Sequence, residues 1–225
     1  MSMDERMAVY LNSLDRGNSP FLEELERQAR QDRVPIIRRE TQSLLKVLLA
    51  MKRPERILEV GTAVGFSAIL MAEACSATCR ITTIENYEKR IPQARRNFRE
   101  AGYQDRITLL EGDAADVLKT LEAPFDFIFM DAAKGQYLAF LPEVLRLMKP
   151  GSILVSDNVL QNGDLLESHY LVERRNRTIY KRMREYLYQL KHRENLVTTI
   201  VPLGDGVAIS VMQETIGCGT RQHAE

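Results

Sequence analysis

The chain has 225 residues, within the range of one α/β domain and long enough to bury a sizeable core. Hydrophobic residues make up 44% and charged residues 28%, an ordinary composition for a soluble protein. The 31 basic and 31 acidic residues balance, so net charge argues neither for nor against a nucleic-acid partner. No apolar run approaches the length that a membrane-spanning helix needs, which excludes such a span.

Cysteine usage indicates the compartment. Cys75, Cys79 and Cys218 are an odd number without the spacing of a disulfide framework, which favours a reducing environment. Cys75 and Cys79 resemble half of a zinc site, but no second pair of Cys or His follows. The charged N-terminus lacks the apolar core of a signal peptide. We therefore expect a cytoplasmic protein with no membrane partner.

The first fifty residues have the pattern of three helices. Residues 4–31 predict two helices broken at residues 17–20, where Ser19 can cap the second helix and Pro20 can begin it. Apolar residues at helical spacing in the second helix predict that it packs on the domain or on a second subunit. In the second case the protein would be a homodimer. Residues 40–51 predict a third helix. Its apolar residues are expected to face the core: Leu44, Leu45, Val47, Leu48 and Leu49.

The segment of residues 34–37, Val-Pro-Ile-Ile, has two interpretations: an apolar staple at a helix entry, or a flap over a binding crevice. From residue 55 onward, strands and helices alternate, which predicts a parallel sheet with helices on both faces. The expected strands are residues 56–60, 80–85, 107–111, 125–131 and 152–156, and the expected helices are residues 67–75, 87–101, 114–121, 136–147 and 171–191.

Two further strands, residues 197–202 and 207–211, flank Gly204, Asp205 and Gly206 and predict an antiparallel hairpin at the sheet edge. We expect one domain over residues 1–212, with residues 1–52 as N-terminal helices packing on it. The polar residues 213–225 are expected to be a disordered tail.

The segment of residues 56–67 reads as a strand, a glycine turn and the start of a helix. Gly61 permits backbone torsions that a side chain would forbid, and it leaves room for a ligand above the strand end. A phosphate loop would need Lys followed by Ser or Thr, and a dinucleotide turn would need glycine where Ala63 stands. Glu59 suits an ammonium group, such as the amino group of S-adenosylmethionine, better than an anion.

Ligand-binding groups of such a sheet lie at the carboxyl ends of its strands. Glu85 follows Gly61 by 24 residues, a spacing at which a carboxylate accepts the ribose hydroxyls of a nucleoside. Alternatively, Glu85 is an acid at a helix N-terminus. Asp113 and the backbone of Ala114 can meet an adenine edge, and Asp113 can equally be an N-cap.

Asp131 follows the strand of residues 125–130, and Asp157 with Asn158 follows the next strand. Neighbouring strands would bring these three oxygen ligands together, a set that suits Mg²⁺, Mn²⁺ or Ca²⁺ rather than zinc. Alternatively, Asp131 and Asp157 only cap the backbone that follows them, and Asn158 is an ordinary turn residue. Two carboxylates at adjacent strand ends repel one another unless a cation joins them, and this favours the metal.

Several motifs resemble the cation-dependent O-methyltransferase family that includes catechol and caffeoyl-CoA O-methyltransferases. They are E-V-G-T-A-V-G-F-S-A, I-E, E-G-D-A, D-A-A-K-G-Q-Y, S-D-N-V-L and P-L-G-D-G-V-A-I-S, within residues 34–212. The resemblance implies a Rossmann-like, seven-stranded class I methyltransferase fold that uses S-adenosylmethionine. It assigns the cofactor to Ile37, Glu59, Gly61, Ser67, Glu85, Asp113, Ala114 and Asp131, and the metal, Mg²⁺ or alternatively Mn²⁺ or Ca²⁺, to Asp131, Asp157 and Asn158. It also implies that Lys134 is the catalytic base, beside Asp131.

A segment rich in basic residues, just before the last hairpin, gives information about the kind of substrate. Arg174, Arg175, Arg177, Lys181 and Arg182 precede the last hairpin, and Arg38 with Arg39 can extend this basic face toward the flap. These residues form either a phosphate-binding surface or an ordinary solvated helix face. The V-P-I, D-A-A-K-G-Q-Y and P-L-G-D-G segments resemble bacterial members of the family that methylate 5-hydroxyuridine at the wobble position of tRNA.

The preferred partner is therefore a tRNA anticodon loop, whose base carries vicinal oxygens as a catechol does. The alternative is a small-molecule catechol or caffeoyl-type substrate. A third hypothesis, a nucleoside-binding regulatory protein without turnover, conflicts with the complete set of Asp131, Lys134, Asp157 and Asn158.

Overall fold

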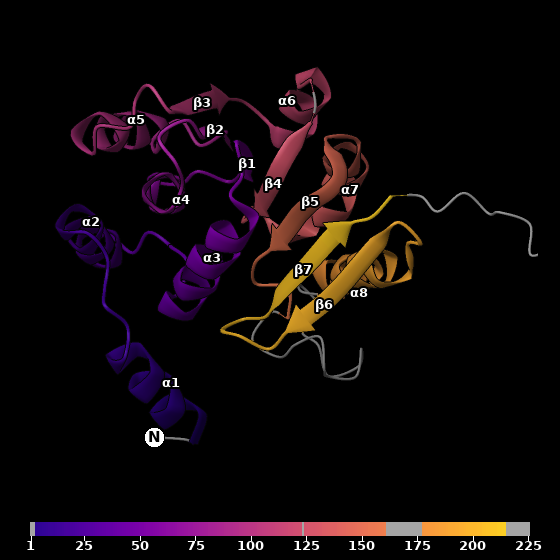
Figure 1. Cartoon of the computed structure of the whole chain (residues 1–225), viewed down its shortest axis with the longest axis horizontal. Helices are drawn as coiled ribbons and strands as arrows, with labels where there is room; N and C mark the ends of the chain where they lie inside the picture. The colour runs from indigo at the N-terminus through magenta and orange to yellow at the C-terminus, as the bar shows by residue number, and fades with distance from the viewer. Residues whose placement is uncertain (1–2, 123, 161–176, 215–225) are drawn as a thin grey trace, which may run out of the picture.

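The computed structural model describes residues 3–122, 124–160 and 177–214. Its centre is a sheet in the order β3-β2-β1-β4-β5-β7-β6 (Figure 1). The strands are β1 (Arg56–Val60), β2 (Arg80–Glu85), β3 (Ile107–Glu111), β4 (Phe125–Met130), β5 (Met148–Ser156), β6 (Leu196–Val201) and β7 (Val207–Met212). The first five strands run parallel, and β7 runs antiparallel to both β5 and β6. The predicted fold class, a doubly wound sheet with an antiparallel edge hairpin, is confirmed.

Helices cover both faces of the sheet (Figure 1). They are α1 (Met3–Ser13), α2 (Pro20–Gln31), α3 (Arg39–Lys52), α4 (Phe66–Ala74), α5 (Ile91–Glu100), α6 (Ala114–Thr120), α7 (Tyr137–Arg146) and α8 (Arg177–His192), with a short 3₁₀ turn, η1 (Lys134–Gln136). Side chains alternate across β1, so Ile57 joins the apolar cluster under α2 to α5 and Leu58 joins the cluster under α6 to α8. Burial of both faces explains why the central strands read as nearly continuous apolar runs.

Several details differ from the prediction or fall outside the described part of the chain. Strand β5 begins at Met148, not at residue 152, and residues 215–225 of the predicted tail lie outside the described residues. Helix α5 begins at Ile91, not at residue 87, because residues 88–90 form a turn and Pro92 suits the first turn of a helix. Val47 is 54% exposed, because α3 turns Leu45 and Leu49 inward and Val47 lies on the opposite face. The segment 171–176 of the predicted long helix lies outside the described residues.

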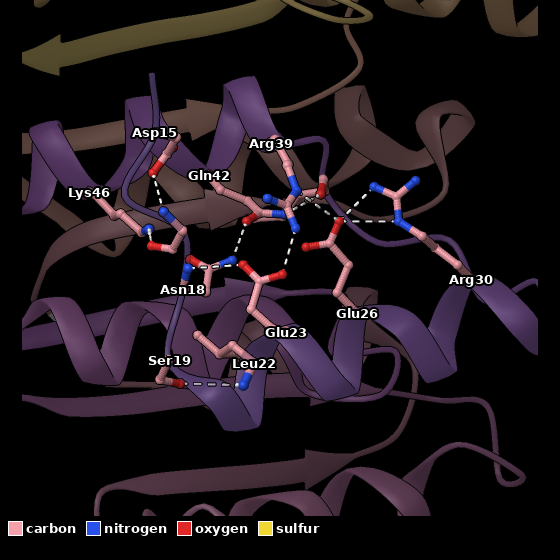
Figure 2. A network of polar contacts seen from close by, with 12 residues as sticks. Asp15, Asn18, Ser19, Leu22, Glu23, Glu26, Arg30, Arg39, Gln42 and Lys46 are labelled. Atoms are coloured by element: carbon pink, nitrogen blue, oxygen red, sulfur yellow. Dashed lines mark hydrogen bonds and ion pairs between the residues drawn. The ribbon is translucent and has the colours of Figure 1, made fainter. Parts of the chain in front are cut away.

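The N-terminal helices are joined to one another by polar contacts. The Ser19 hydroxyl accepts a hydrogen bond from the backbone N–H of Leu22, so the predicted cap of α2 is confirmed. Figure 2 shows Arg39 of α3 facing two carboxylates of α2, with N–O distances of 2.6 Å to Glu23 and 3.4 Å to Glu26. Glu26 is buried and also pairs with Arg30. These contacts fix α2 against the start of α3, directly after residues 34–38. In the described part of the chain, no helix combines the length and apolar character that crossing a membrane requires.

Candidate active site

Backbone hydrogen bonds continue one residue beyond the central strands and align the residues that follow them. Gly61 donates to the carbonyl of Ile84, Asp131 donates to that of Val60, and Asp157 donates to that of Met130. Gly61, Asp131 and Asp157 therefore stand side by side at the carboxyl edge of the sheet. This is the edge at which open α/β sheets bind ligands.

A cavity of about 600 Å³ lies over this edge. Most of the predicted cofactor and metal residues line it together: Ile37, Gly61, Ser67, Glu85, Asp113, Ala114, Asp131, Lys134 and Asn158. Pro35 and Ile36 line it as well, so the position of residues 34–37 agrees with the flap interpretation. Glu59 and Asp157 are fully or almost fully buried and do not line the cavity.

Glu59 lies behind the cavity wall. Its carboxyl accepts hydrogen bonds from the hydroxyls of Ser67 and Thr83, both at 2.5 Å. Burial raises the pKa of Glu59 to about 8, against the lowering effect of these two hydrogen bonds. In this conformation Glu59 reaches the cavity through the Ser67 hydroxyl, whereas the sequence predicted direct contact with a cofactor.

Glu85 and Asp113 lie at one end of the cavity. The Glu85 carboxylate accepts backbone hydrogen bonds from Ala63, at 2.7 Å, and from Asn86 and Tyr87. These bonds fix the carboxylate at the cavity wall, and α5 begins too late for Glu85 to be its N-terminal acid. The Asp113 carboxylate accepts from the N–H of Ala115 and caps α6, so the N-cap interpretation is confirmed. Asp113 also lines the cavity.

Asp131 and Asp157 form an acidic pair at the other end. Burial, together with the charge of the neighbouring Asp157, raises the pKa of Asp131 to about 7. Burial likewise raises the pKa of Asp157 to about 6. The positive charge of Lys134 opposes both shifts. Two desolvated acids, one of which raises the pKa of the other, make a site at which a cation is favoured.

The donor set fits a hard divalent cation. Asn158 adopts a left-handed backbone, with φ of 55°, which asparagine tolerates better than most residues. Its amide nitrogen donates to Asp205 at 3.4 Å, which leaves the amide oxygen available to a ligand. Among the described residues no three His, Cys, Asp or Glu side chains form a metal cluster, and the predicted set has two carboxylates and one amide. Carboxylate and amide oxygens are the ligands that Mg²⁺, Mn²⁺ and Ca²⁺ prefer.

Two buried tyrosines support this end of the site. The Tyr137 hydroxyl donates to the carbonyls of Met130 and Asp157, at 3.0 and 3.1 Å, and so joins the ends of β4 and β5. Tyr186 shares a hydrogen bond with Ser156, the last residue of β5. No role was predicted for either tyrosine, although Tyr137 is the last residue of the D-A-A-K-G-Q-Y motif.

The basic residues fall into three groups. Arg38 lines the cavity and pairs with Asp205. Arg39 is turned toward α2 and bound by Glu23 and Glu26, which argues against its predicted role in RNA binding (Figure 2). Arg177, Lys181 and Arg182 lie on α8, and Arg182 donates to the carbonyl of Gly135 in η1 at 3.0 Å. Arg174 and Arg175 lie outside the described residues.

Comparison with known proteins identifies the class to which this fold and site belong. A family model described as O-methyltransferase matches residues 12–213, so the chain belongs to that family. It is 37% identical over 123 residues to a catechol O-methyltransferase from Mycobacterium tuberculosis, which covers 54% of this chain and 56% of that protein. The matched stretch thus spans little more than half the length of that curated relative.

Two further comparisons cover more of the chain. Caffeoyl-CoA O-methyltransferase 1 from Eucalyptus globulus is 28% identical over 178 residues, 73% of this chain and 70% of that protein. The O-methyltransferase TomG from Streptomyces achromogenes, solved in complex with SAM, superposes with a TM-score of 0.83 at 27% identity. That superposition covers 95% of this chain and 100% of the other.

Proposed function

We propose that the chain is an S-adenosylmethionine- and divalent-cation-dependent O-methyltransferase acting on one of two vicinal oxygens. One observation carries the proposal: a single cavity brings together a nucleoside end, at Glu85 and Asp113, and an acidic end, at Asp131, Asn158 and Lys134. Membership in the O-methyltransferase family supports it. The SAM complex of a structure with the same fold supports the choice of cofactor.

The cofactor's contacts follow from the cavity walls. The fixed carboxylate of Glu85 would accept the ribose hydroxyls, and Asp113 with the backbone of Ala114 would meet the adenine edge. Gly61 would let the cofactor lie against the main chain. The cofactor's ammonium would lie near Ser67, whose hydroxyl oxygen can accept a hydrogen bond from it while the hydroxyl itself donates to Glu59.

Asp131, Asp157 and Asn158 would hold the metal, Mg²⁺ or alternatively Mn²⁺ or Ca²⁺. When bound, a divalent cation would lower the pKa of a neighbouring substrate hydroxyl. In its neutral amine form, Lys134, which lines the cavity, would accept the proton of that hydroxyl. The resulting oxyanion would take the methyl group as its carbon–sulfur bond breaks, S-adenosylhomocysteine would leave, and Lys134 would hold the proton until it is released to water. Binding both reactants in one cavity supplies part of the acceleration.

The names of the curated relatives, catechol and caffeoyl-CoA O-methyltransferases, favour a small molecule with vicinal oxygens. A second candidate is 5-hydroxyuridine in a tRNA anticodon loop, whose 5-hydroxyl and O4 form an equivalent pair. The observation that favours it is the basic start of α8, where Arg182 contacts the turn that carries Lys134. A single-stranded loop suits a cavity bordered by basic side chains.

Methyl transfer from labelled S-adenosylmethionine, measured with Mg²⁺, tests both candidates. The acceptors are 3,4-dihydroxyphenyl compounds and tRNA carrying 5-hydroxyuridine. We expect transfer to one class, and a loss of at least about 100-fold in Lys134→Met, since a general base typically contributes that much. Lys119→Met, which removes an exposed lysine of α6, is the matched control and should keep the native rate. Binding of the cofactor with no transfer to either class would favour the regulatory hypothesis instead.

A further inference from the structure

Asp205, at the tip of the β6–β7 hairpin, joins two walls of the cavity. One carboxylate oxygen accepts from Arg38 at 2.8 Å, and the other accepts from the side-chain amide of Asn158 at 3.4 Å. Arg38, Asn158 and Asp205 all line the cavity. Asp205 is also mostly buried, with 15% of its side chain exposed, against 52% for Arg38.

The backbone keeps this hairpin tip in register with the loop that carries Asn158. Leu160 donates to the carbonyl of Asp205 at 2.8 Å, and Val159 donates to that of Gly206 at 2.9 Å. A Cβ atom on Gly206 would lie 2.3 Å from Cγ of Leu160, so the side chain of Leu160 packs directly against Gly206. Asp205 is therefore fixed relative to Asn158 by main-chain contacts and not only by its own side chain.

The orientation of the Asn158 amide determines whether its oxygen or its N–H groups face the cavity. An amide has a donor end and an acceptor end on opposite sides of the same carbon atom. Because the donor end faces Asp205, the acceptor oxygen faces away from it. A reversed amide would present N–H groups to a cation and would place its oxygen against a carboxylate, so Asp205 selects the orientation that a metal ligand needs.

We propose that Asp205 is a positioning residue that holds the Asn158 amide with its oxygen available to the cation, while Arg38 balances the charge of Asp205. This role rests on the proposed function, because it assumes that Asp131, Asp157 and Asn158 hold a metal. Partners of this kind, which orient a metal ligand without touching the metal, typically change metal affinity by 10- to 100-fold when they are removed.

The test is Mn²⁺ affinity, measured without substrate by the electron paramagnetic resonance signal of the free ion. Asp205→Ala removes the acceptor, and we expect binding about 10-fold weaker or more. Asp205→Asn keeps an oxygen that can accept from Asn158, so it should stay within about 3-fold of the native affinity. Asp116→Asn removes one negative charge from an exposed residue of α6 outside the cavity and should leave the affinity unchanged. Thermal unfolding shows whether each variant is folded.

The outcomes separate this role from the proposed function. Weak binding by Asp205→Ala with rescue by Asp205→Asn supports the positioning role. Native affinity in Asp205→Ala overturns this role alone. Equal weakening in both variants assigns the effect to charge and also overturns it. If the wild type itself binds no Mn²⁺, the metal in the proposed function fails, and the role of Asp205 fails with it.

Discussion

A Cβ atom placed on Gly61 would lie 2.1 Å from the backbone carbonyl oxygen of Asp131. The turn after β1 and the residue after β4 are thus in direct main-chain contact. Asp131 in turn stands beside Asp157, whose N–H bonds to the last residue of β4. The proposed cofactor and metal ends of the cavity are therefore parts of one rigid strand-end arrangement.

Gly61→Ala should destabilise the protein severely. Its φ is 104°, and the clash is with backbone atoms that cannot rotate away. We expect a loss of about 3 kcal/mol or more in the free energy of unfolding in urea. Gly102→Ala is the control, because Gly102 also has positive φ, 76°, but a Cβ there meets nothing within 4 Å. It should cost only about 1 kcal/mol, and equal losses in the two variants would contradict the close contact.

The pH dependence of the free energy of unfolding should reveal the raised pKa of Glu59. Its pKa is about 8 in the folded protein, above the ordinary value of 4.5. The folded state thus holds a proton that the unfolded state has lost, and the stability that this proton contributes is lost as pH rises from about 5 through 8. Glu59→Gln stays neutral, so its stability relative to wild type should rise over this window, by on the order of 4 kcal/mol in total.

Urea unfolding at several pH values measures this difference. Glu88→Gln, which changes an exposed carboxylate, is the control and should follow the wild type at every pH. A flat difference between Glu59→Gln and the wild type would mean that Glu59 is ionised within the folded protein.

Local patterns were sufficient to predict most of the fold. The alternating strands and helices, the Ser19 cap and the edge hairpin follow from apolar periodicity and turn residues, and the structure confirms them. The boundary error at α5 arose because residues 87–90 have no strong helix-breaking residue, and the Glu85 carboxylate binds the backbone of Asn86 and Tyr87. Such a contact between a side chain and the following backbone leaves no periodic signal.

The site was predicted where strand order alone brings residues together, as at Gly61, Asp131 and Asn158. Asp205 was read only as a turn residue, since its approach to Asn158 depends on β7 pairing with β5. An acidic residue between two glycines at a hairpin beside the metal strands is the signal that could have identified it. Arg39 was misjudged for the opposite reason: its partners, Glu23 and Glu26, lie on a helix whose docking the sequence leaves open.

Arg39→Met should weaken the N-terminal packing. It removes one of the two arginines that pair with the buried Glu26, and we expect a loss of about 2 kcal/mol in the free energy of unfolding. Arg27→Met breaks an exposed ion pair with Glu24 and should leave the free energy of unfolding nearly unchanged. A loss no larger in Arg39→Met than in this control would show that the network shown in Figure 2 contributes little.

Arg182→Glu tests the basic start of α8. If tRNA is the substrate, reversing this charge beside η1 should weaken tRNA binding and reduce the slope of log affinity against log salt by about 1. Arg96→Glu reverses an exposed charge on α5 and should leave the slope unchanged. Identical slopes in the wild type and Arg182→Glu would separate this part of α8 from RNA binding.

The most direct test of the central claim is methyl transfer measured together with S-adenosylhomocysteine binding, in chelator-treated and Mg²⁺-restored protein. We expect chelation to abolish transfer to the accepted substrate, restored Mg²⁺ to recover it, and cofactor binding to persist throughout. Asp157→Asn, whose side chain lies behind the cavity wall, should bind S-adenosylhomocysteine but transfer methyl poorly even with Mg²⁺. Transfer at the native rate by the chelated wild type, or by folded Asp157→Asn, would contradict the account.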